Sequence, residues 1–377
     1  MKCEIKNMLK KFEVCNFKCF DKKLSLDFMA RDYKFNNHIV KNSIVNKAII
    51  YGKNGSGKTS LGCAMFDIIT HLTDKQRLNY SHYHYYKNLN RIKEPIEFSY
   101  TFQFDEDELV YKYQKDTVDS LINEELILNG EPILFYDYLK KRKNYIDSKL
   151  FGNINIDLTD NKLSIIKYIY RNTPTNDNSP ISKLMKFANS MLWYRSLSEG
   201  NCYAGFTNGS SALVDKLYEN RSKLKDFEKF LKENGLDYKL RFEENYNGKV
   251  ELMAKFSNRV EVPFLEIAST GTQTLLLYFI WSIYAFENVS FLFIDEFDAF
   301  LHFESAELLV KLLNQQTNFQ TMLTSHNTYL MNNSLTRPDC CFIIQNGYVK
   351  NLFDCTDREI REAHNLEKMY IKGVFTE

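Results

Sequence analysis

A glycine-rich stretch has the spacing of a phosphate-binding loop. Residues 52–59 read G-K-N-G-S-G-K-T, which fits the pattern G-x-x-x-x-G-K-[ST]. The glycines let successive backbone N–H groups surround a phosphate, while Lys58 can neutralise the β- and γ-phosphate oxygens and Thr59 can bind Mg²⁺. The chain has no N-K-x-D motif for reading guanine, so ATP is the expected nucleotide. The predicted nucleotide-binding residues are Gly52, Asn54, Gly55, Ser56, Gly57, Lys58, Thr59 and Ser60.

Two adjacent carboxylates supply the acidic groups that hydrolysis needs. Asp295 and Glu296 directly follow the apolar run 291–294, which is typical of a buried strand. In phosphoryl transfer the first carboxylate is suited to holding Mg²⁺, and the second to orienting and deprotonating the attacking water. An exposed acidic turn is the alternative interpretation. We predict that Asp295 and Thr59 are metal ligands and that Glu296 and Lys58 are catalytic.

These side chains need strand ends and helix starts to position them. The apolar run 47–51 predicts a buried strand before the loop, and residues 60–69 predict a helix after it. The loop would then lie at the positive end of a helix, which favours an anion. A third strand-like run, 319–323, precedes Thr324-Ser325-His326-Asn327, and a second helix is predicted over 274–286.

Further motifs surround the acidic pair in a fixed order. They are Asn54 in the phosphate loop, Ser269-Thr270-Gly271-Thr272-Gln273, Phe297–His302, and the segment with His326. With the opening V-x-N-F-x-x-F of residues 14–20, they resemble ABC-type ATPases of the SMC, Rad50 and RecF branch. The resemblance covers about the first hundred and the last hundred and forty residues. It implies an α/β P-loop NTPase fold with a mixed sheet flanked by helices and an antiparallel β lobe.

The resemblance also implies roles for residues outside the phosphate loop. Ser269-x-Gly271 matches the signature S-G-G, with Thr270 in place of the first glycine. In the family, Ser269, Gly271 and Thr272 would contact the nucleotide of a second copy, so two chains would sandwich two ATP molecules. His302 would close the D-loop, and His326 would be the switch histidine at the γ-phosphate. An ordinary capped helix remains the alternative for Ser269–Thr272. No Q-loop glutamine is assigned, because Gln103 lies in a strand-like run.

The polar tail from Thr356 to Tyr370 and the segments Met191–Arg195 and Asp295–His302 resemble a narrower group. This group is the stand-alone AAA-15-type ATPases of abortive-infection and phage-defence systems. Its members are thought to act with a separately encoded effector, often a nuclease or another toxin. The alternative for the tail is a solvated, charged terminal helix.

Length and composition fit a globular enzyme that is expected in the cytoplasm. The 377 residues carry 49 basic and 48 acidic side chains, a net charge of +1, so bulk charge favours neither a nucleic acid nor a membrane as partner. The polar start has no apolar signal region, and the apolar run 274–286 is too short to cross a bilayer. None of the eight cysteines forms C-x-x-C, which favours reduced thiols.

The elements predict three parts. Residues 1–115 hold the N-terminal half of the ATPase domain and a β-pair over 95–105 and 108–114; residues 116–235 form a compact helical insertion; residues 236–377 complete the ATPase domain. Within the insertion, Leu121–Arg171 has mixed helical patterns, Pro180 opens a helix to about Leu197, and Ser210 or Ser211 caps another that Gly235 ends. Tyr246-Asn247-Gly248 predicts a hairpin between 238–244 and 249–255.

Three other sequence features point to alternative functions. The aromatic and basic stretch Tyr80–Tyr86 could stack single-stranded nucleic acid, but a surface loop packed on the lobe is the favoured interpretation. His82 and His84 lack nearby partners for a metal site. Asp105-x-Asp107 resembles a Toprim nuclease motif, yet too few residues follow His326 for a C-terminal nuclease.

The sequence thus predicts an ATPase that dimerises around Mg-ATP and controls a separately encoded nuclease or toxin, with DNA or a phage component as further candidate partners. Three alternatives stay open. They are a RecF/SMC-like DNA-binding repair ATPase, a nucleotide sensor that does not hydrolyse ATP, and a self-contained nuclease.

Overall fold

A mixed seven-stranded sheet forms the centre of the molecule. The structure is a computed structural model, and it describes residues 7–75, 83–152, 156–158, 160–174, 176–195, 203–204, 213–244, 248, 250–284 and 288–375. The strand order is β12-β11-β16-β17-β5-β18-β19. The five inner strands are parallel, and the two edge strands are antiparallel to their neighbours. The strands are β5 (Lys47–Tyr51), β11 (Met191–Arg195), β12 (Tyr203–Ala204), β16 (Phe291–Asp295), β17 (Gln320–Ser325), β18 (Cys341–Gln345) and β19 (Tyr348–Asn351).

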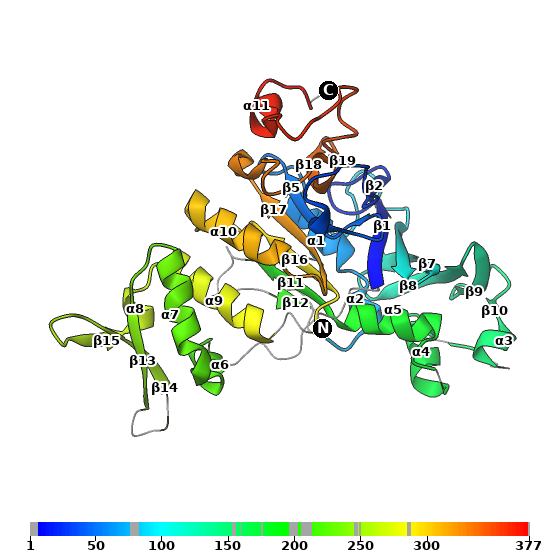
Figure 1. Cartoon of the computed structure of the whole chain (residues 1–377). Helices are drawn as coiled ribbons and strands as arrows, with labels where there is room; N and C mark the ends of the chain where they lie inside the picture. The colour runs from blue at the N-terminus through cyan, green and yellow to red at the C-terminus, as the bar shows by residue number, and fades with distance from the viewer. Residues whose placement is uncertain are drawn as a thin grey trace.

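Helices cover both faces of this sheet, which explains why its inner strands are continuous apolar runs. Phe291 and Phe293 share one core with α1 (Lys58–Met65), α2 (Ile69–Leu72) and α5 (Pro180–Asn189). The alternate residues Leu292 and Ile294 share a second core with α9 (Thr270–Tyr284) and α10 (Phe303–Asn314). Figure 1 shows α10 and α9 lying along one side of the sheet. The mixed sheet flanked by helices is the fold that the sequence predicts.

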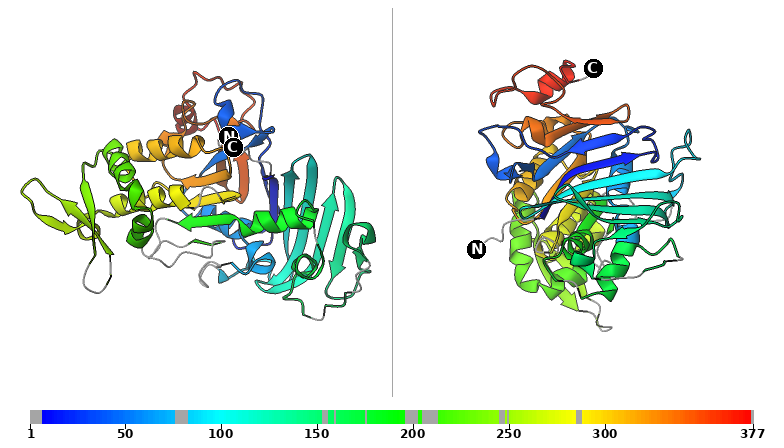
Figure 2. Two further views of the ribbon diagram at one scale, coloured as in Figure 1. Left: turned by 60° about the horizontal axis from the view of Figure 1, so that its bottom comes forward. Right: turned by 90° about the vertical axis from the view of Figure 1, so that its right-hand side faces the viewer.

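An antiparallel lobe packs beside the central sheet (Figure 2). Its strand order is β10-β9-β8-β7-β6-β1-β2. The strands are β1 (Asn7–Cys15), β2 (Leu24–Asp27), β6 (Ile96–Phe104), β7 (Asp107–Thr117), β8 (Ser120–Leu128), β9 (Glu131–Asp137) and β10 (Tyr145–Ile146). A small pair, β3 (Val40–Lys41) and β4 (Ile44–Val45), precedes β5. The predicted pair over 95–105 and 108–114 is confirmed as β6 and β7.

The prediction that residues 116–235 form a helical insertion is wrong in its first part, because β8, β9 and β10 extend the lobe to Ile146. In β8, the buried residues are separated by one or two partly exposed ones, a spacing that an amphipathic helix can also show. Helical structure begins only with α3 (Ser148–Phe151) and α4 (Ile165–Asn172). The division of the chain at residues 115 and 235 stays a prediction.

Two predicted helices are shorter than expected. The helix that Pro180 opens ends at Asn189, and the following residues form the buried strand β11 rather than continuing to Leu197. A short apolar run fits a buried strand as well as a helix, so periodicity alone cannot separate the two. The helix expected to end at Gly235 is divided into α6 (Leu213–Glu219) and α7 (Leu224–Glu233). Its expected caps, Ser210 and Ser211, lie outside the described residues.

The second half of the insertion and the segment before α9 form one satellite unit. The hairpin strands β13 (Lys239–Glu244) and β14 (Val250–Lys255) are present as predicted, although Tyr246 and Asn247 lie outside the described residues. With β15 (Glu261–Pro263) and α8 (Phe264–Ile267) they pack on α6, α7 and α9 around a third core. This unit projects from the end of the sheet opposite the lobe (Figure 1).

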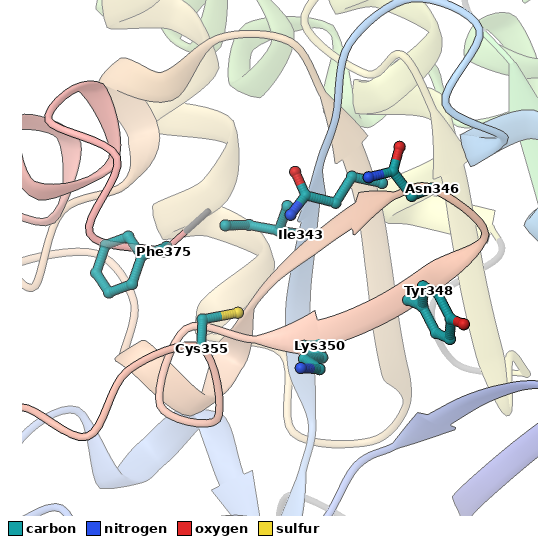
Figure 3. A pocket seen from close by; sticks show the side chains of 7 residues that line it. Ile343, Asn346, Tyr348, Lys350, Cys355 and Phe375 are labelled. Atoms are coloured by element: carbon teal, nitrogen blue, oxygen red, sulfur yellow. The ribbon is translucent and has the colours of Figure 1, made fainter. Parts of the chain in front are cut away.

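The C-terminal tail packs on the rest of the chain and is not freely solvated. Its short helix α11 (Leu366–Ile371) buries Leu366, and Phe375 is 2% exposed. The Asn333 side-chain amide donates to three tail carbonyls, those of Arg361, Glu362 and His364. Figure 3 shows Phe375 facing Ile343 of β18 across a pocket of about 400 Å³, which contains none of the predicted site residues. No helix in the described part of the chain is long and apolar enough to cross a bilayer.

A buried ionic cluster joins the lobe to the turn between α1 and α2, just after the helix that follows the phosphate loop. The Lys115 ammonium of β7 lies 2.7 Å from the Asp67 carboxylate, and both side chains are 0% exposed. Asp67 also accepts hydrogen bonds from the hydroxyls of Tyr86, at 2.5 Å, and Tyr113, at 3.0 Å. Charges at this depth are tolerated only when paired, so the lobe and α1 are held as one unit.

Replacing Lys115 by alanine should lower the free energy of unfolding by roughly 3–5 kcal/mol, because it leaves a buried carboxylate without its cation. The matched control is Lys112→Ala on the same strand. Lys112 forms a partly exposed pair with Glu125, so its loss should cost about 1 kcal/mol or less. Urea unfolding followed by circular dichroism measures both. Equal losses in the two variants would contradict the buried-pair interpretation.

Candidate functional site

The phosphate loop joins the end of β5 to the first residue of α1. Lys58 begins the helix, and Gly57 has a left-handed backbone with φ 102°. A Cβ on Gly57 would lie 2.9 Å from the Cys19 sulfur and 3.0 Å from the Phe20 ring, while one on Gly52 would lie 2.8 Å from the Ile344 carbonyl oxygen. The loop is therefore packed so closely that these two positions require glycine. Gly55, at the tip, has φ 76°.

The first turn of α1 offers its N–H groups to an anion, because Gly57 provides no side-chain cap. Asn54 lies at the exposed tip, and the Ser56 hydroxyl is buried without a hydrogen-bond partner among the described residues. Ser60 lies one turn inward, beside the Cys19 thiol. The loop residues predicted from the sequence therefore lie together around one helix start.

Lys58 is held inside the loop. Its ammonium donates to the Gly52 carbonyl oxygen at 2.7 Å and to the Lys53 carbonyl oxygen at 3.2 Å, and it lies 3.4 Å from Nδ1 of His326. Burial lowers the pKa of Lys58, and the nearby Asp295 and Glu296 carboxylates oppose that shift. A phosphate would supply the anionic partner that these carbonyl oxygens replace only partly.

Asp295 is fully buried at the end of β16. Its Oδ2 accepts a hydrogen bond from the Thr59 hydroxyl at 2.7 Å, and its Oδ1 accepts one from the Thr324 hydroxyl at 2.7 Å. The two residues predicted as Mg²⁺ ligands, far apart in sequence, are thus in direct contact. A hydroxyl and a carboxylate oxygen at one point match the oxygen ligands that Mg²⁺ prefers, so the residues fit this metal.

Glu296 turns sharply away from the strand, with φ 49°. Its backbone N–H donates to the same Thr324 hydroxyl at 2.7 Å, and its carboxylate lies 3.8 Å from Nε2 of His326. A left-handed conformation is costly for glutamate, and such strain is concentrated at functional sites. The geometry therefore places the predicted general base beside the predicted switch histidine.

The next acidic residue, Asp298, is tied to the switch segment. The Ser325 hydroxyl donates to its carboxylate at 2.6 Å, and burial raises the pKa of Asp298. Neither residue has a role that the sequence motifs predict. Their contact joins the turn after β16 to the end of β17.

The predicted signature residues form a separate group. Ser269 caps α9 by accepting a hydrogen bond from the Thr272 N–H at 3.2 Å, and the two hydroxyls are 3.0 Å apart. A Cβ on Gly271 would lie 2.5 Å from the Phe300 carbonyl oxygen. Ser269 itself is exposed. Gly271 thus packs against the turn after β16.

Two other residues, His302 and Gln103, have contacts on elements other than the phosphate loop. His302 occupies the N-cap position of α10, is exposed, and lies 3.8 Å from Glu304. Gln103 is in β6 of the lobe, where its amide donates to the carbonyls of Asp105 and Asp107. The Gln103 side chain is thus held by the turn between β6 and β7.

Sequence reasoning missed Arg195. It ends β11, the strand next to β16, and its Nε lies 3.5 Å from Oδ2 of Asp295. Its terminal nitrogen lies 3.8 Å from the Glu296 carboxylate. A charged residue at the end of the apolar run Met191–Arg195 could have indicated a site residue at a strand end. Because a helix was expected over these residues, the run was not interpreted as a strand.

The aromatic stretch Tyr80–Tyr86 and the cysteines lie outside the nucleotide motifs. Tyr83 and Tyr86 are buried, so they pack on the protein, although Tyr85 is exposed. Tyr80, Ser81 and His82 lie outside the described residues. Among the residues that the structure covers, no group of three or more His, Cys, Asp or Glu side chains is arranged to hold a metal. Cys19 is exposed, and the buried Cys63, Cys340 and Cys341 are free thiols.

A family model matches residues 47–332 of the chain; it describes an "AAA domain, putative AbiEii toxin, Type IV TA system". No curated protein matches. Similar solved structures include an SMC head bound to the C-terminal winged-helix domain of ScpA, at 16% identity and a TM-score of 0.45 over 91% of this chain and 97% of that one. The SMC head of Thermotoga maritima is 15% identical with a TM-score of 0.42, over 90% and 97%. RecF with ATP is 14% identical with a TM-score of 0.37, over 92% and 99%. Similarity at this level says nothing about what this chain binds.

Proposed function

Because the family match spans most of the chain, the chain belongs to this AAA-domain family, and we propose that it binds and hydrolyses Mg-ATP to control a separate effector protein. The contact that carries the proposal is the 2.7 Å hydrogen bond between Thr59 and Asp295. It joins the phosphate loop to the acidic strand end, with Lys58 and Glu296 on either side. No other part of the described chain brings together a phosphate-binding loop and two carboxylates.

The proposed chemistry assigns one task to each group. The first-turn N–H groups of α1 and the Lys58 ammonium would bind the β- and γ-phosphates. Thr59 and Asp295 would hold Mg²⁺, which neutralises charge on the phosphates. Glu296 would orient the attacking water and accept its proton, and His326 would contact the γ-phosphate.

Replacing Glu296 by glutamine should slow ATP turnover by about 10²–10⁴-fold, the usual contribution of a general base. The amide keeps the size of the side chain but cannot accept the proton, so ATP affinity should change little. Lys58→Ala should instead weaken triphosphate binding. Phosphate release measures turnover, and a fluorescent ATP analogue measures binding.

The control is Glu233→Gln, which changes an exposed carboxylate in the last turn of α7. It should keep wild-type turnover. If Glu296→Gln also turns over ATP at the wild-type rate, Glu296 is not the general base. If the wild type hydrolyses no ATP, the ATPase proposal fails as a whole.

We further propose that two chains complete each other's sites. Ser269 is exposed at the start of α9, so its hydroxyl is accessible to a second copy, which supports a role toward that copy. Three exposed aromatic residues are close in sequence to the site. Phe300 and Phe303, each 38% exposed, follow β16, and Tyr329, 51% exposed, follows the segment that contains His326. Phe303 and Tyr329 pack with ring centres 5.0 Å apart. Apolar surface beside a catalytic site is typical of an interface.

In this arrangement Ser269→Arg should abolish hydrolysis while its own phosphate loop still binds ATP. Glu266→Arg, an exposed change on the preceding helix α8, is the matched control and should remain active. ATP should cause Glu296→Gln to associate, as measured by light scattering. Mixing Ser269→Arg with Lys58→Ala should restore no more than one intact site per heterodimer. A protein that stays monomeric at full activity contradicts the composite site.

A separate effector is supported by the family description and by an exposed apolar surface. The family description refers to a toxin–antitoxin system, which supports a two-component arrangement and a role in abortive infection. Exposed apolar side chains at the end of the satellite unit offer a docking surface; they are Phe256, Val260, Leu265 and Ile267, each 39–48% exposed. When ATP closes the dimer, the position of this surface relative to the second chain would change, and with it the binding of the effector.

The test is expression of the chain alone and together with the products of its neighbouring genes during phage challenge. Only the combination should restrict phage, and Glu296→Gln should remove the effect. Phe256→Asp should uncouple the effector without changing ATP turnover. If the purified chain alone cleaves nucleic acid, or alone arrests growth, the effector proposal is wrong.

A further inference from the structure

Arg195 lies beside the two site carboxylates, and the sequence motifs give it no role of its own. It is the last residue of β11, in register with Asp295, the last residue of β16. Neighbouring residues in register point to the same face of a sheet, so both side chains lie on the α1 side. Figure 1 shows β11 next to β16.

The position of Arg195 matters because Asp295 is 0% exposed and its two hydrogen-bond donors, the hydroxyls of Thr59 and Thr324, are uncharged. A carboxylate at this depth requires a cation. Lys58 is turned away, toward the loop carbonyls of Gly52 and Lys53. Among the described residues, Arg195 is the cation that lies within ion-pair distance of Asp295.

The contact uses the same oxygen that the metal would use. Oδ2 of Asp295 faces both the Thr59 hydroxyl, at 2.7 Å, and Nε of Arg195, at 3.5 Å. Nε is buried and has no hydrogen-bond partner among the described residues. Its position is thus set by charge rather than by a hydrogen bond. A divalent cation between Thr59 and Asp295 would be repelled by the guanidinium.

We infer that Arg195 is an internal counter-cation that competes with Mg²⁺ for Asp295. In the absence of nucleotide it neutralises the Asp295–Glu296 pair and keeps the affinity of the site for free Mg²⁺ low. Mg²⁺ then binds with a triphosphate, whose negative charge offsets the repulsion. This inference rests on the proposed Mg-nucleotide site and names a positioning residue for it.

The experiment measures metal binding without nucleotide and without turnover. Mn²⁺ serves as the probe, because its electron paramagnetic resonance signal broadens when it binds. At constant ionic strength, nucleotide-free Arg195→Gln should bind Mn²⁺ at least about tenfold more tightly than wild type, since one nearby unit charge is removed. Arg195→Lys keeps the charge and should retain the weak wild-type affinity.

Two further variants separate this effect from nonspecific binding. Lys186→Gln removes one positive charge from α5, where Lys186 pairs with Asp177, and should leave Mn²⁺ affinity unchanged. Adding Asp295→Asn to Arg195→Gln should abolish the gain. Equal Mn²⁺ affinity in wild type and Arg195→Gln, or a gain that survives Asp295→Asn, overturns the inference. The result stands whether or not the wild type hydrolyses ATP, so failure of the proposed function is recognised separately.

Discussion

The fold of the site depends on one buried carboxylate. Asp295 ends β16 at full burial, and its two oxygens accept hydroxyl hydrogen bonds from Thr59 on α1 and Thr324 on β17. Thr324 in turn accepts the N–H of Glu296, which holds that residue in its left-handed turn. A single acidic group therefore sets the distance between the phosphate loop, the acidic pair and the switch segment. Losing one donor would leave an unsatisfied buried charge, which is why these three segments must move together.

The parts of the site that were predictable from the sequence are those built from local pattern. The loop 52–59 and the pair Asp295–Glu296 each combine an apolar run with a short motif, and each lies where that pattern places it. Arg195 was not predictable, because its role arises from the pairing of β11 with β16, which lie almost a hundred residues apart. The lobe strands β8 to β10 were missed for a related reason. Their apolar faces are completed by β7 and by each other, and a single strand carries no sign of its neighbours.

The departure from the S-G-G signature has a steric explanation. Only Gly271 approaches another backbone, with the Phe300 carbonyl oxygen 2.5 Å from where its Cβ would lie. Thr270, in place of the first glycine, is exposed and meets no such limit. The glycine that the motif retains is thus the one that packing against the turn after β16 requires. This close approach also means that a displacement of the signature segment would reach that turn directly.

The strand order has a consequence for how the chain folds. β5, which carries the phosphate loop, has β17 on one side and β18 on the other, and both come from the last sixty residues of the sequence. β5 therefore has no hydrogen-bonded neighbour in the sheet until almost the whole polypeptide has been synthesised. Closing so large a loop costs conformational entropy, and contacts of this separation slow folding. The apolar edge of β5 would be exposed during synthesis, which makes the nascent chain a natural substrate for chaperones.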